Sequence, residues 1–306
     1  QMFAKIPIRK IYFLFFLLGF IGILVIWNNS KIKDLSRLSS VNFKFKNSLK
    51  MTDRINIIKL IKTNHDFLRG RLKVLNKNIS IYLHYKNDYI SQKIINNSVW
   101  EWGIVGELLK FMKNYPKAQF IDVGCNLGVY SLSVASMGHQ VNAIDANSNN
   151  TDRLAQSVIT NGFANKFTII LNAVSNVRKS FSMNVDQSNI GGQFLTNQTT
   201  SYVVKSILMD DLLSITGENK EFIFKMDIQG SEINLFKETS NFFAKNNILI
   251  ILIEWEWIKL DKECYILIYF LMSRGFRPFA TISSTTELDV SNYRAWPYDI
   301  VWRKLA

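Results

Sequence analysis

The stretch Gln119-Phe-Ile-Asp122-Val-Gly124-Cys-Asn126-Leu-Gly128-Val-Tyr130 decides the fold of this 306-residue chain. Its apolar run predicts a buried strand, and the two glycines allow a tight turn with close backbone approach. Residues 129–137 then have the apolar spacing of a helix, and residues 141–145 indicate a second strand that ends on Asp145. A strand, a glycine turn, a helix, a strand and an acid, in this order, are typical of a doubly wound α/β sheet that binds a nucleoside cofactor.

The residues around the glycines indicate which cofactor this is. Asp145 follows Gly124 by 21 residues, where a carboxylate accepts hydrogen bonds from ribose hydroxyls. Asn126 replaces the glycine that a pyrophosphate would need, and the Asp122 carboxylate would repel phosphate, which disfavours a nucleotide-dependent oxidoreductase. The same carboxylate suits S-adenosylmethionine, whose methionine end carries an ammonium and a sulfonium. The alternative is a Rossmann-like unit in which the glycines serve only packing.

A second motif reads Phe222-Ile-Phe-Lys225-Met-Asp227-Ile-Gln229-Gly230-Ser-Glu232. An apolar strand ends at Asp227, a glycine turn follows, and Glu232 opens a helix. Ligands of open α/β sheets bind at the carboxyl ends of the strands, so Asp122, Asp145 and Asp227 should converge on one rim. Three carboxylates facing one crevice are costly unless a cation binds there.

Together the two motifs resemble those of the FkbM-like S-adenosylmethionine-dependent methyltransferases, over residues 80–306. The resemblance implies a seven-stranded, mainly parallel class I methyltransferase sheet with a β-hairpin insertion at residues 180–205. It also implies methyl transfer to an acceptor, which we expect to be a hydroxyl of a glycan, a lipid or a small molecule. One position departs from the family pattern, because Gln229 stands where a glutamate is usual, and an amide cannot take a proton.

The rim geometry and the resemblance together give the candidate site residues. We expect Glu101 to close over the cofactor and Asn172-Ala173 to lie beside the adenine. The expected cofactor-binding residues are Glu101, Asp122, Gly124, Asn126, Gly128, Asp145, Asn172, Ala173 and Asp227, and the expected catalytic residues are Asp227, Glu232 and Glu254. A bound metal and the oligomeric state remain open.

Two further functions compete with this interpretation. Gln229 would fit a catalytically inactive, membrane-tethered binding or scaffold protein on a methyltransferase fold. A nucleic-acid methylase is disfavoured, because Asp227-Ile-Gln-Gly lacks the Asp/Asn-Pro-Pro-aromatic step that grips a flipped base. The net charge of +13 does not argue for nucleic acid either, since residues 31–77 hold thirteen Lys and Arg against three Asp, a net +10, and the rest is nearly balanced.

The amino-terminal part predicts a membrane anchor. Residues 11–27 are seventeen uncharged, mostly apolar residues, which span about 25 Å as a helix. No small-residue cleavage site follows them, so an uncleaved anchor is favoured over a signal peptide, and we expect a single-pass, type II protein of the secretory pathway. The expected domains are a tail at 1–10, the anchor at 11–27, a basic stem and linker at 28–79, and the catalytic domain at 80–306. Within the linker, Thr52 and the isoleucines after it predict a short capped helix.

Overall fold

The computed structural model describes residues 54–62, 65–85, 88–184, 190, 193, 195–196, 199–237 and 241–304. The chain forms two compact units, Gln1–Leu49 and Lys50–Ala306, and the described residues all belong to the second. The expected anchor at 11–27 and the expected cap Thr52 lie outside these residues. No helix in the described ranges is long and apolar enough to cross a membrane.

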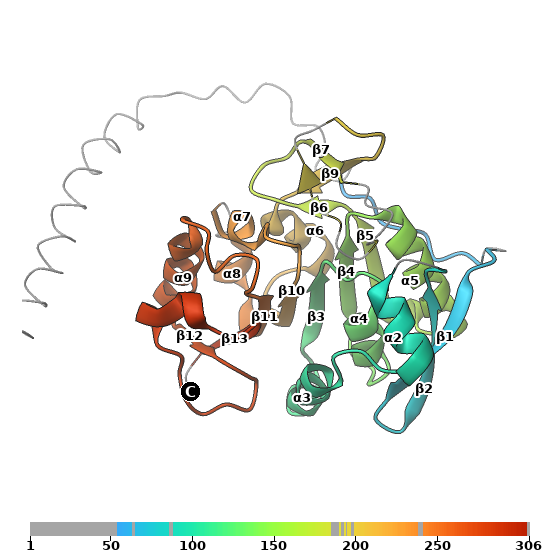
Figure 1. Cartoon of the computed structure of the whole chain (residues 1–306), viewed down its shortest axis with the longest axis horizontal. Helices are drawn as coiled ribbons and strands as arrows, with labels where there is room; N and C mark the ends of the chain where they lie inside the picture. Colours follow the sequence, from blue (N-terminus) through green and yellow to red (C-terminus); the bar gives the residue numbers. More distant parts are fainter. Residues whose placement is uncertain are drawn as a thin grey trace, which may run out of the picture. The chain divides into compact units, whose positions relative to one another are not determined.

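A seven-stranded sheet forms the centre of the unit, as the family resemblance implied (Figure 1). Neighbouring strands among β11, β10, β3, β4 and β5 run parallel, while β13 is antiparallel to both β11 and β12. The carboxyl ends of the five parallel strands therefore meet at one rim, together with the start of β13. From edge to edge, the strands are β12 (Phe276–Phe279), β13 (Asp299–Lys304), β11 (Asn247–Glu254), β10 (Glu221–Met226), β3 (Gln119–Val123), β4 (Val141–Asp145) and β5 (Phe167–Leu171).

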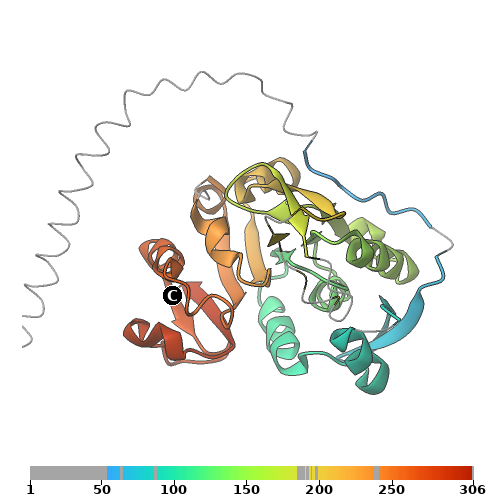
Figure 2. The same ribbon diagram turned by 45° about the horizontal axis from the view of Figure 1, so that its top comes forward.

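Helices cover both faces of this sheet (Figure 2). Successive strand residues point to opposite faces, so Phe120 belongs to one buried cluster and Ile121 to the other. The first cluster includes residues of α3, α4 and α5, and the second includes residues of α7, α8 and α9. The helices are α2 (Tyr89–Asn97), α3 (Trp102–Met112), α4 (Val129–Ala135), α5 (Ser148–Thr160), α6 (Leu213–Thr216), α7 (Glu232–Lys237), α8 (Asn241–Lys245) and α9 (Cys264–Ser273), with short 3-10 turns η2 (Ala164–Lys166), η4 (Met209–Leu212) and η5 (Val290–Ala295).

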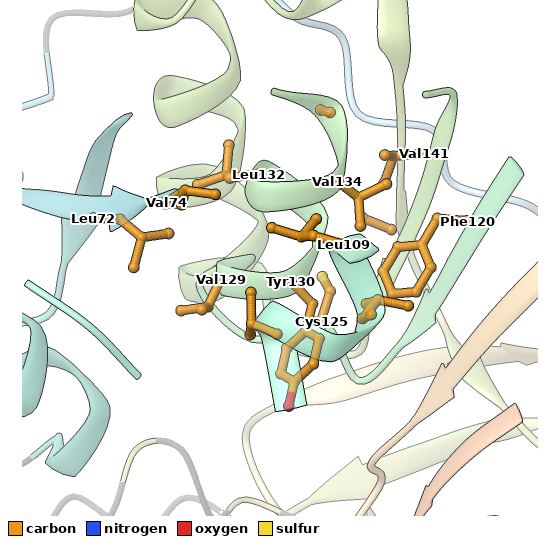
Figure 3. Close-up of a cluster of buried hydrophobic side chains, with 14 of the residues drawn as sticks. Leu72, Val74, Leu109, Phe120, Cys125, Val129, Tyr130, Leu132, Val134 and Val141 are labelled. Carbon is orange, nitrogen blue, oxygen red and sulfur yellow. The ribbon is translucent and has the colours of Figure 1, made fainter. Parts of the chain in front are cut away.

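An antiparallel hairpin of β1 (Leu68–Val74) and β2 (Lys77–Leu83) packs on the first cluster. Leu72 and Val74 are at most 2% exposed, and Figure 3 shows them beside Leu132 of α4. The compact unit thus includes residues that the sequence analysis assigned to the stem and linker. Burial of these apolar side chains connects the hairpin to the same core as the sheet.

The expected short helix after Thr52 is wrong for its described part. Ile57 forms an antiparallel bridge with Ile170, and the backbone of Asn56 and Ile58 bonds to that of Leu171 and Ile169 at 2.8 and 2.9 Å. The segment therefore covers the outer edge of β5. An edge strand offers unpaired backbone groups, and β-branched isoleucine suits an extended chain that pairs with them.

The insertion expected at residues 180–205 is confirmed as antiparallel pairing, and it belongs to a second, four-stranded sheet. Figure 1 shows this sheet above β4 and β5. The hydroxyl of Tyr202, just before β9, donates to Ala146 O and accepts from Ser148 N, so the insertion is attached to the loop after β4. Its strands are β6 (Ala173–Val174), β9 (Val203–Ile207), β7 (Ser180–Met183) and β8 (Leu195–Thr196), in that order.

Candidate active site

The loop after β3 is the floor of the site. Gly124 has φ +80°, and a Cβ built there would lie 1.8 Å from the carbonyl oxygen of Asp227. The loops after β3 and β10 therefore touch backbone to backbone, which only glycine permits at this position. Asn126 has φ +50° although it is not a glycine, and Gly128, at φ +82°, starts α4 against Leu154.

Asp145 ends β4 and holds this floor in place. Its Oδ2 accepts from Asn126 N, and its Oδ1 accepts from Asn147 N, both at 2.8 Å. Burial raises the pKa of the carboxyl to about 6, against the backbone hydrogen bonds that lower it. Oδ1 also accepts from the Asn150 amide nitrogen at 3.3 Å. Oδ2 has a second lone-pair site, and Asp145 lines the pocket, so Oδ2 can still accept from a ribose hydroxyl.

Asp122 lies beneath the floor and is not among the described residues that line the pocket. It is 1% exposed, its Oδ2 accepts from the Ser131 hydroxyl at 2.7 Å, and its Oδ1 has no described partner. Lys225 occupies the neighbouring position on β10. Burial raises the pKa of Asp122, although the Lys225 charge opposes the shift. Asp122 was expected to contact the cofactor, but it is buried beneath the pocket floor, because its side chain is held by Ser131 of α4.

The second motif forms a chain of charged hydrogen bonds. The Lys225 ammonium donates to Asp227 Oδ2 at 2.9 Å. The Gln229 amide nitrogen donates to Asp227 Oδ1 and to Glu254 Oε2, again at 2.9 Å each. Gln229, at φ +54°, holds a backbone conformation unusual for a side chain with a Cβ, and such strain is characteristic of functional sites. The one residue that departs from the family pattern therefore joins two carboxyl groups.

Glu254, at the end of β11, lines the pocket and is 7% exposed. Burial, with the neighbouring Asp227, raises the pKa of Glu254 to about 9. For Asp227, burial works against ionisation, yet Lys225 and the surrounding hydrogen bonds hold the pKa below its usual value. The pair therefore holds a protonated Glu254 beside an ionised Asp227 at neutral pH.

Glu232 lies elsewhere. It is fully buried at the start of α7, its Oε1 accepts from Ile228 N at 2.7 Å, and its Oε2 has no partner among the described residues. Burial raises the pKa of Glu232 to about 7. The side chain turns back onto the loop at Ile228 because it caps that turn, and it is absent from the described pocket lining. This position gives Glu232 no access to an acceptor, so it fixes the loop that carries Gln229.

Three remaining candidates differ in their roles. Glu101 lines the pocket, and its Oε2 accepts from the Tyr130 hydroxyl at 2.6 Å. Asn172 also lines the pocket, but its amide is used by the backbone of Arg54, Asn56 and Lys205. Asn172 therefore connects the segment at Arg54 and Asn56 to the insertion. Its neighbour Ala173 contributes only a small side chain to the pocket wall.

These residues surround one pocket of about 620 Å³, within the size range of small-molecule sites. At one end lie the loop after β3, Asp145 and the insertion residues Met183, Gln193 and Leu195. At the other end lie the carboxyl ends of β10 and β11. In the described part of the chain, no group of three or more His, Cys, Asp or Glu side chains could hold a metal ion.

The sequence analysis missed three residues at the second end. Tyr298 and Trp257 line the pocket and are 51% and 56% exposed. Burial and a hydrogen bond to Glu254 raise the pKa of the Tyr298 hydroxyl. Asp299 begins β13, and burial raises the pKa of its carboxyl to about 6. The sequence feature that could have identified Trp257 as a site residue is the run Glu254-Trp-Glu-Trp257, which follows a buried strand. Tyr298 precedes β13 and Asp299 begins it, and the start of this strand is placed at the rim only by its antiparallel pairing with β11.

Comparison with known families matches residues 122–278 to the methyltransferase FkbM domain. The matched region is half of the chain and contains both motifs. The chain belongs to the FkbM methyltransferase family. It is an S-adenosylmethionine-dependent methyltransferase, and S-adenosylmethionine is its cofactor.

Comparison with curated proteins finds no match. Solved structures similar to this methyltransferase include a methyltransferase from Agrobacterium tumefaciens, at 10% identity and TM-score 0.39, over 79% of this chain and 72% of that one. Another is the magnesium protoporphyrin IX methyltransferase from Synechocystis with bound S-adenosylmethionine, at 10% identity and TM-score 0.37, over 71% and 84%. A third is an rRNA methylase from Streptococcus thermophilus, at 12% identity and TM-score 0.33, over 62% and 88%.

The pocket of the methyltransferase fits this cofactor. Gly124 leaves open backbone where a Cβ would collide, and Asp145 presents a carboxylate beside it. The charge also fits, because Lys225 is the only Lys or Arg among the described lining residues, against the acidic residues Asp88, Glu101, Asp145, Asp227 and Glu254. An acidic pocket favours a ligand that carries an ammonium and a sulfonium.

Proposed function

We propose that this methyltransferase methylates a hydroxyl of an uncharged acceptor, with Glu254 as the base. The observation that carries the proposal is the double hydrogen bond from Gln229, which holds Glu254 at the pocket surface against Asp227. A positioned base within hydrogen-bond reach contributes about 10²–10⁴-fold to a proton transfer. When bound, S-adenosylmethionine supplies the electrophilic methyl group.

In this proposal the residues of the site divide the work. Asp145 orients the nucleoside through its carboxylate, and the loop of Gly124 lets the backbone approach it. Lys225 keeps Asp227 ionised, and Gln229 keeps Glu254 beside it. Glu101 and Asp227 outnumber Lys225 at this end of the pocket, and Glu254 adds a further negative charge when it is ionised, as its role as the base requires. Glu254 then accepts the proton of the acceptor hydroxyl.

The charge at this end of the pocket limits the acceptor. A phosphate or carboxylate placed there would be repelled by Asp227, whose partner Lys225 is already paired, and by Glu254 in the ionised form in which it acts as the base. We therefore propose a neutral acceptor and not a nucleic acid.

Trp257 and Tyr298 support a glycan over a lipid or a flat small molecule. Both are half-exposed at the pocket, beside the hydrogen-bonding groups of Gln229 and Glu254. The negative face of an aromatic ring attracts polarised C–H groups, and a sugar ring offers such a face together with several hydroxyls. The Trp257 side chain starts next to the Gln229 turn, since its Cβ lies 3.7 Å from where a Cβ of Gly230 would be.

A matched pair of acceptors tests this proposal. Transfer of tritiated methyl from S-adenosylmethionine is measured for neutral methyl glycosides, including methyl glucoside, and for methyl glucuronide, which adds only a carboxylate. We expect transfer to neutral glycosides and at least about tenfold less to the glucuronide, a difference of ~1.4 kcal/mol. The Trp257→Ala variant should raise KM more than it lowers kcat. Equal transfer to the charged sugar would refute a neutral acceptor, and transfer only to lipids or aromatic phenols would refute a glycan.

The competing function is an inactive scaffold, and the observation that favours it is Gln229 itself. An amide there cannot exchange a proton, whereas the family pattern has a glutamate. The two functions differ in the effect of Gln229→Glu. An active enzyme should lose or keep activity with this change, because glutamate lacks the amide NH2 group that donates to both Asp227 and Glu254. A scaffold would gain activity where the native chain has none.

We also propose that residues 11–27 anchor the chain in a membrane as a type II, single-pass protein. The support is the uncharged run between Lys10 and Lys31. Deletion of residues 1–30 should move the protein from the membrane fraction to the soluble fraction without loss of cofactor binding. A mature amino terminus just after Trp27 would instead identify a cleaved signal peptide.

A further inference from the structure

The positive charge near Glu254 and Asp227 is too small to stabilise both carboxyl groups in their ionised forms. Lys225 is paired with Asp227, and Gln229 offers each carboxyl a neutral N–H. Other acids surround the pair, so ionisation of Glu254 would add a further negative charge to a half-buried cluster. The titratable and charged groups that act on Glu254 are Lys225, Asp227 and Tyr298. Around Lys225 and Asp227 lie further acids, Asp122, Glu101 and Asp299, and Glu101 accepts from the Tyr130 hydroxyl.

The same arrangement becomes favourable once a cation enters. A positive charge within about 4–6 Å of a carboxyl lowers the carboxyl pKa by about 1–3. S-adenosylmethionine has a sulfonium that is retained only until the methyl group is transferred. Glu254 lines the pocket that binds this cofactor, so its charge state should follow the charge on the sulfur.

We infer that Glu254 is protonated before the cofactor binds and releases its proton to solvent when S-adenosylmethionine binds. This inference rests on the proposed function, in which Glu254 is the base. Cofactor binding then prepares the base, because the arriving sulfonium replaces the proton as the positive charge beside Asp227. Gln229 is the positioning residue of this exchange, since it holds both carboxyls whether or not the proton is present.

The proton and charge balance closes over one turnover. Binding places a sulfonium in the pocket and sends the Glu254 proton to the buffer. In transfer, the sulfur–methyl bond breaks, the acceptor oxygen forms a bond to the methyl group, and its O–H proton goes to Glu254. The sulfur keeps the electron pair and becomes neutral, so S-adenosylhomocysteine leaves a protonated Glu254, as at the start. The net release is one proton for each methyl transferred.

The pH dependence has a definite sign. Burial raises the pKa of free Glu254 to about 9, and a bound sulfonium lowers it. S-adenosylmethionine affinity should therefore rise with pH between the pKa of the complex and about 9, by at most tenfold for each pH unit. S-adenosylhomocysteine has the same nucleoside and amino acid but a neutral sulfur, so this group should contribute no such slope to its binding.

Calorimetric titration in buffers of different ionisation enthalpy measures the protons released. We use the full chain at pH 8 with S-adenosylmethionine or S-adenosylhomocysteine. Wild type should release at least about 0.4 proton more with the first ligand than with the second, if the carboxyl pKa falls from about 9 by about 1–3. The Glu254→Gln variant keeps an acceptor for Gln229 and should abolish that difference, with circular dichroism showing that it is folded. Protons taken up or released at Asp145 should be equal for the two ligands, because both carry the same nucleoside. They therefore cancel in the difference between the ligands.

Each outcome decides a separate claim. Equal proton release by the two ligands, or a difference that survives in Glu254→Gln, overturns the inference while leaving the proposed function intact. Failure of both ligands to bind would instead remove the cofactor on which the proposed function depends. Gln229→Asn, whose shorter amide cannot reach both carboxyls, should reduce the difference between the ligands without abolishing binding.

Discussion

Glu232 shows how one buried carboxyl can fix a site without touching its ligand. Its hydrogen bond from Ile228 N holds the turn, and burial raises its pKa to about 7. Because the folded pKa exceeds the unfolded value near 4.5, the folded state binds more protons between these values, and stability falls as pH rises through about 7. Between pH 5.5 and 8.5 this group should cost about 2 kcal/mol of unfolding free energy.

The Glu232→Gln variant tests that expectation. Its amide oxygen can still accept from Ile228 N, but it does not ionise, so its stability should lack this loss with rising pH. Urea unfolding of wild type and variant at the two pH values measures the difference. Parallel changes in both proteins would show that Glu232 is not the titrating group.

At the scale of residues, the sequence predicted which strand ends carry acidic residues but not which way their side chains point. The strand ends predicted Asp145, Asp227 and Glu254 at one rim, and all three line the pocket. Asp122 and Glu232 were expected to contact ligands and are buried away from it. Alternation along a strand or helix decides which side a residue faces, and a shift of one position between neighbouring elements reverses that result.

At the scale of elements, contact between two loops depends on Gly124. Gly124→Ala would put a methyl group into the Asp227 carbonyl at a positive φ, so the loops after β3 and β10 must separate. We expect a loss of about 3 kcal/mol or more and loss of cofactor binding. Gly138→Ala is the matched control, since its φ is +97° with nothing within 4 Å of the added Cβ, and it should cost about 1–2 kcal/mol. Thermal unfolding and calorimetry compare the two, and equal losses would contradict the loop contact.

Elements whose signals are local agreed with prediction. Residues 141–145 were expected as a strand and form β4, and the helix expected over residues 129–137 forms α4, Val129–Ala135. The segment around Ile57 could not be assigned from neighbours, because its partner Ile170 is more than a hundred residues away. Isoleucine spacing alone does not separate a short helix from an edge strand.

At the scale of the whole molecule, the hairpin of β1 and β2 determines the shortest part of the chain that should fold. A chain of residues 80–306 would lose Leu72, Val74 and Ile79, each nearly fully buried and worth roughly 1.5–3 kcal/mol. Such a loss is comparable with the total stability of a domain, about 5–15 kcal/mol. Residues 50–306 should therefore give a cooperative thermal transition and residues 80–306 should not. A cooperative transition of the shorter chain at a similar temperature would show that the hairpin is dispensable.

The central claim is that this pocket binds S-adenosylmethionine through Asp145 and the Gly124 loop. Calorimetric titration of the chain with S-adenosylmethionine and with NAD tests it most directly, with Asp145→Ala as the variant. We predict saturable binding of S-adenosylmethionine, no comparable binding of NAD, and a loss of about 1.5–3 kcal/mol, at least roughly tenfold in affinity, in the variant. NAD binding as tight as that of S-adenosylmethionine, or an Asp145→Ala variant with unchanged affinity, would contradict the account.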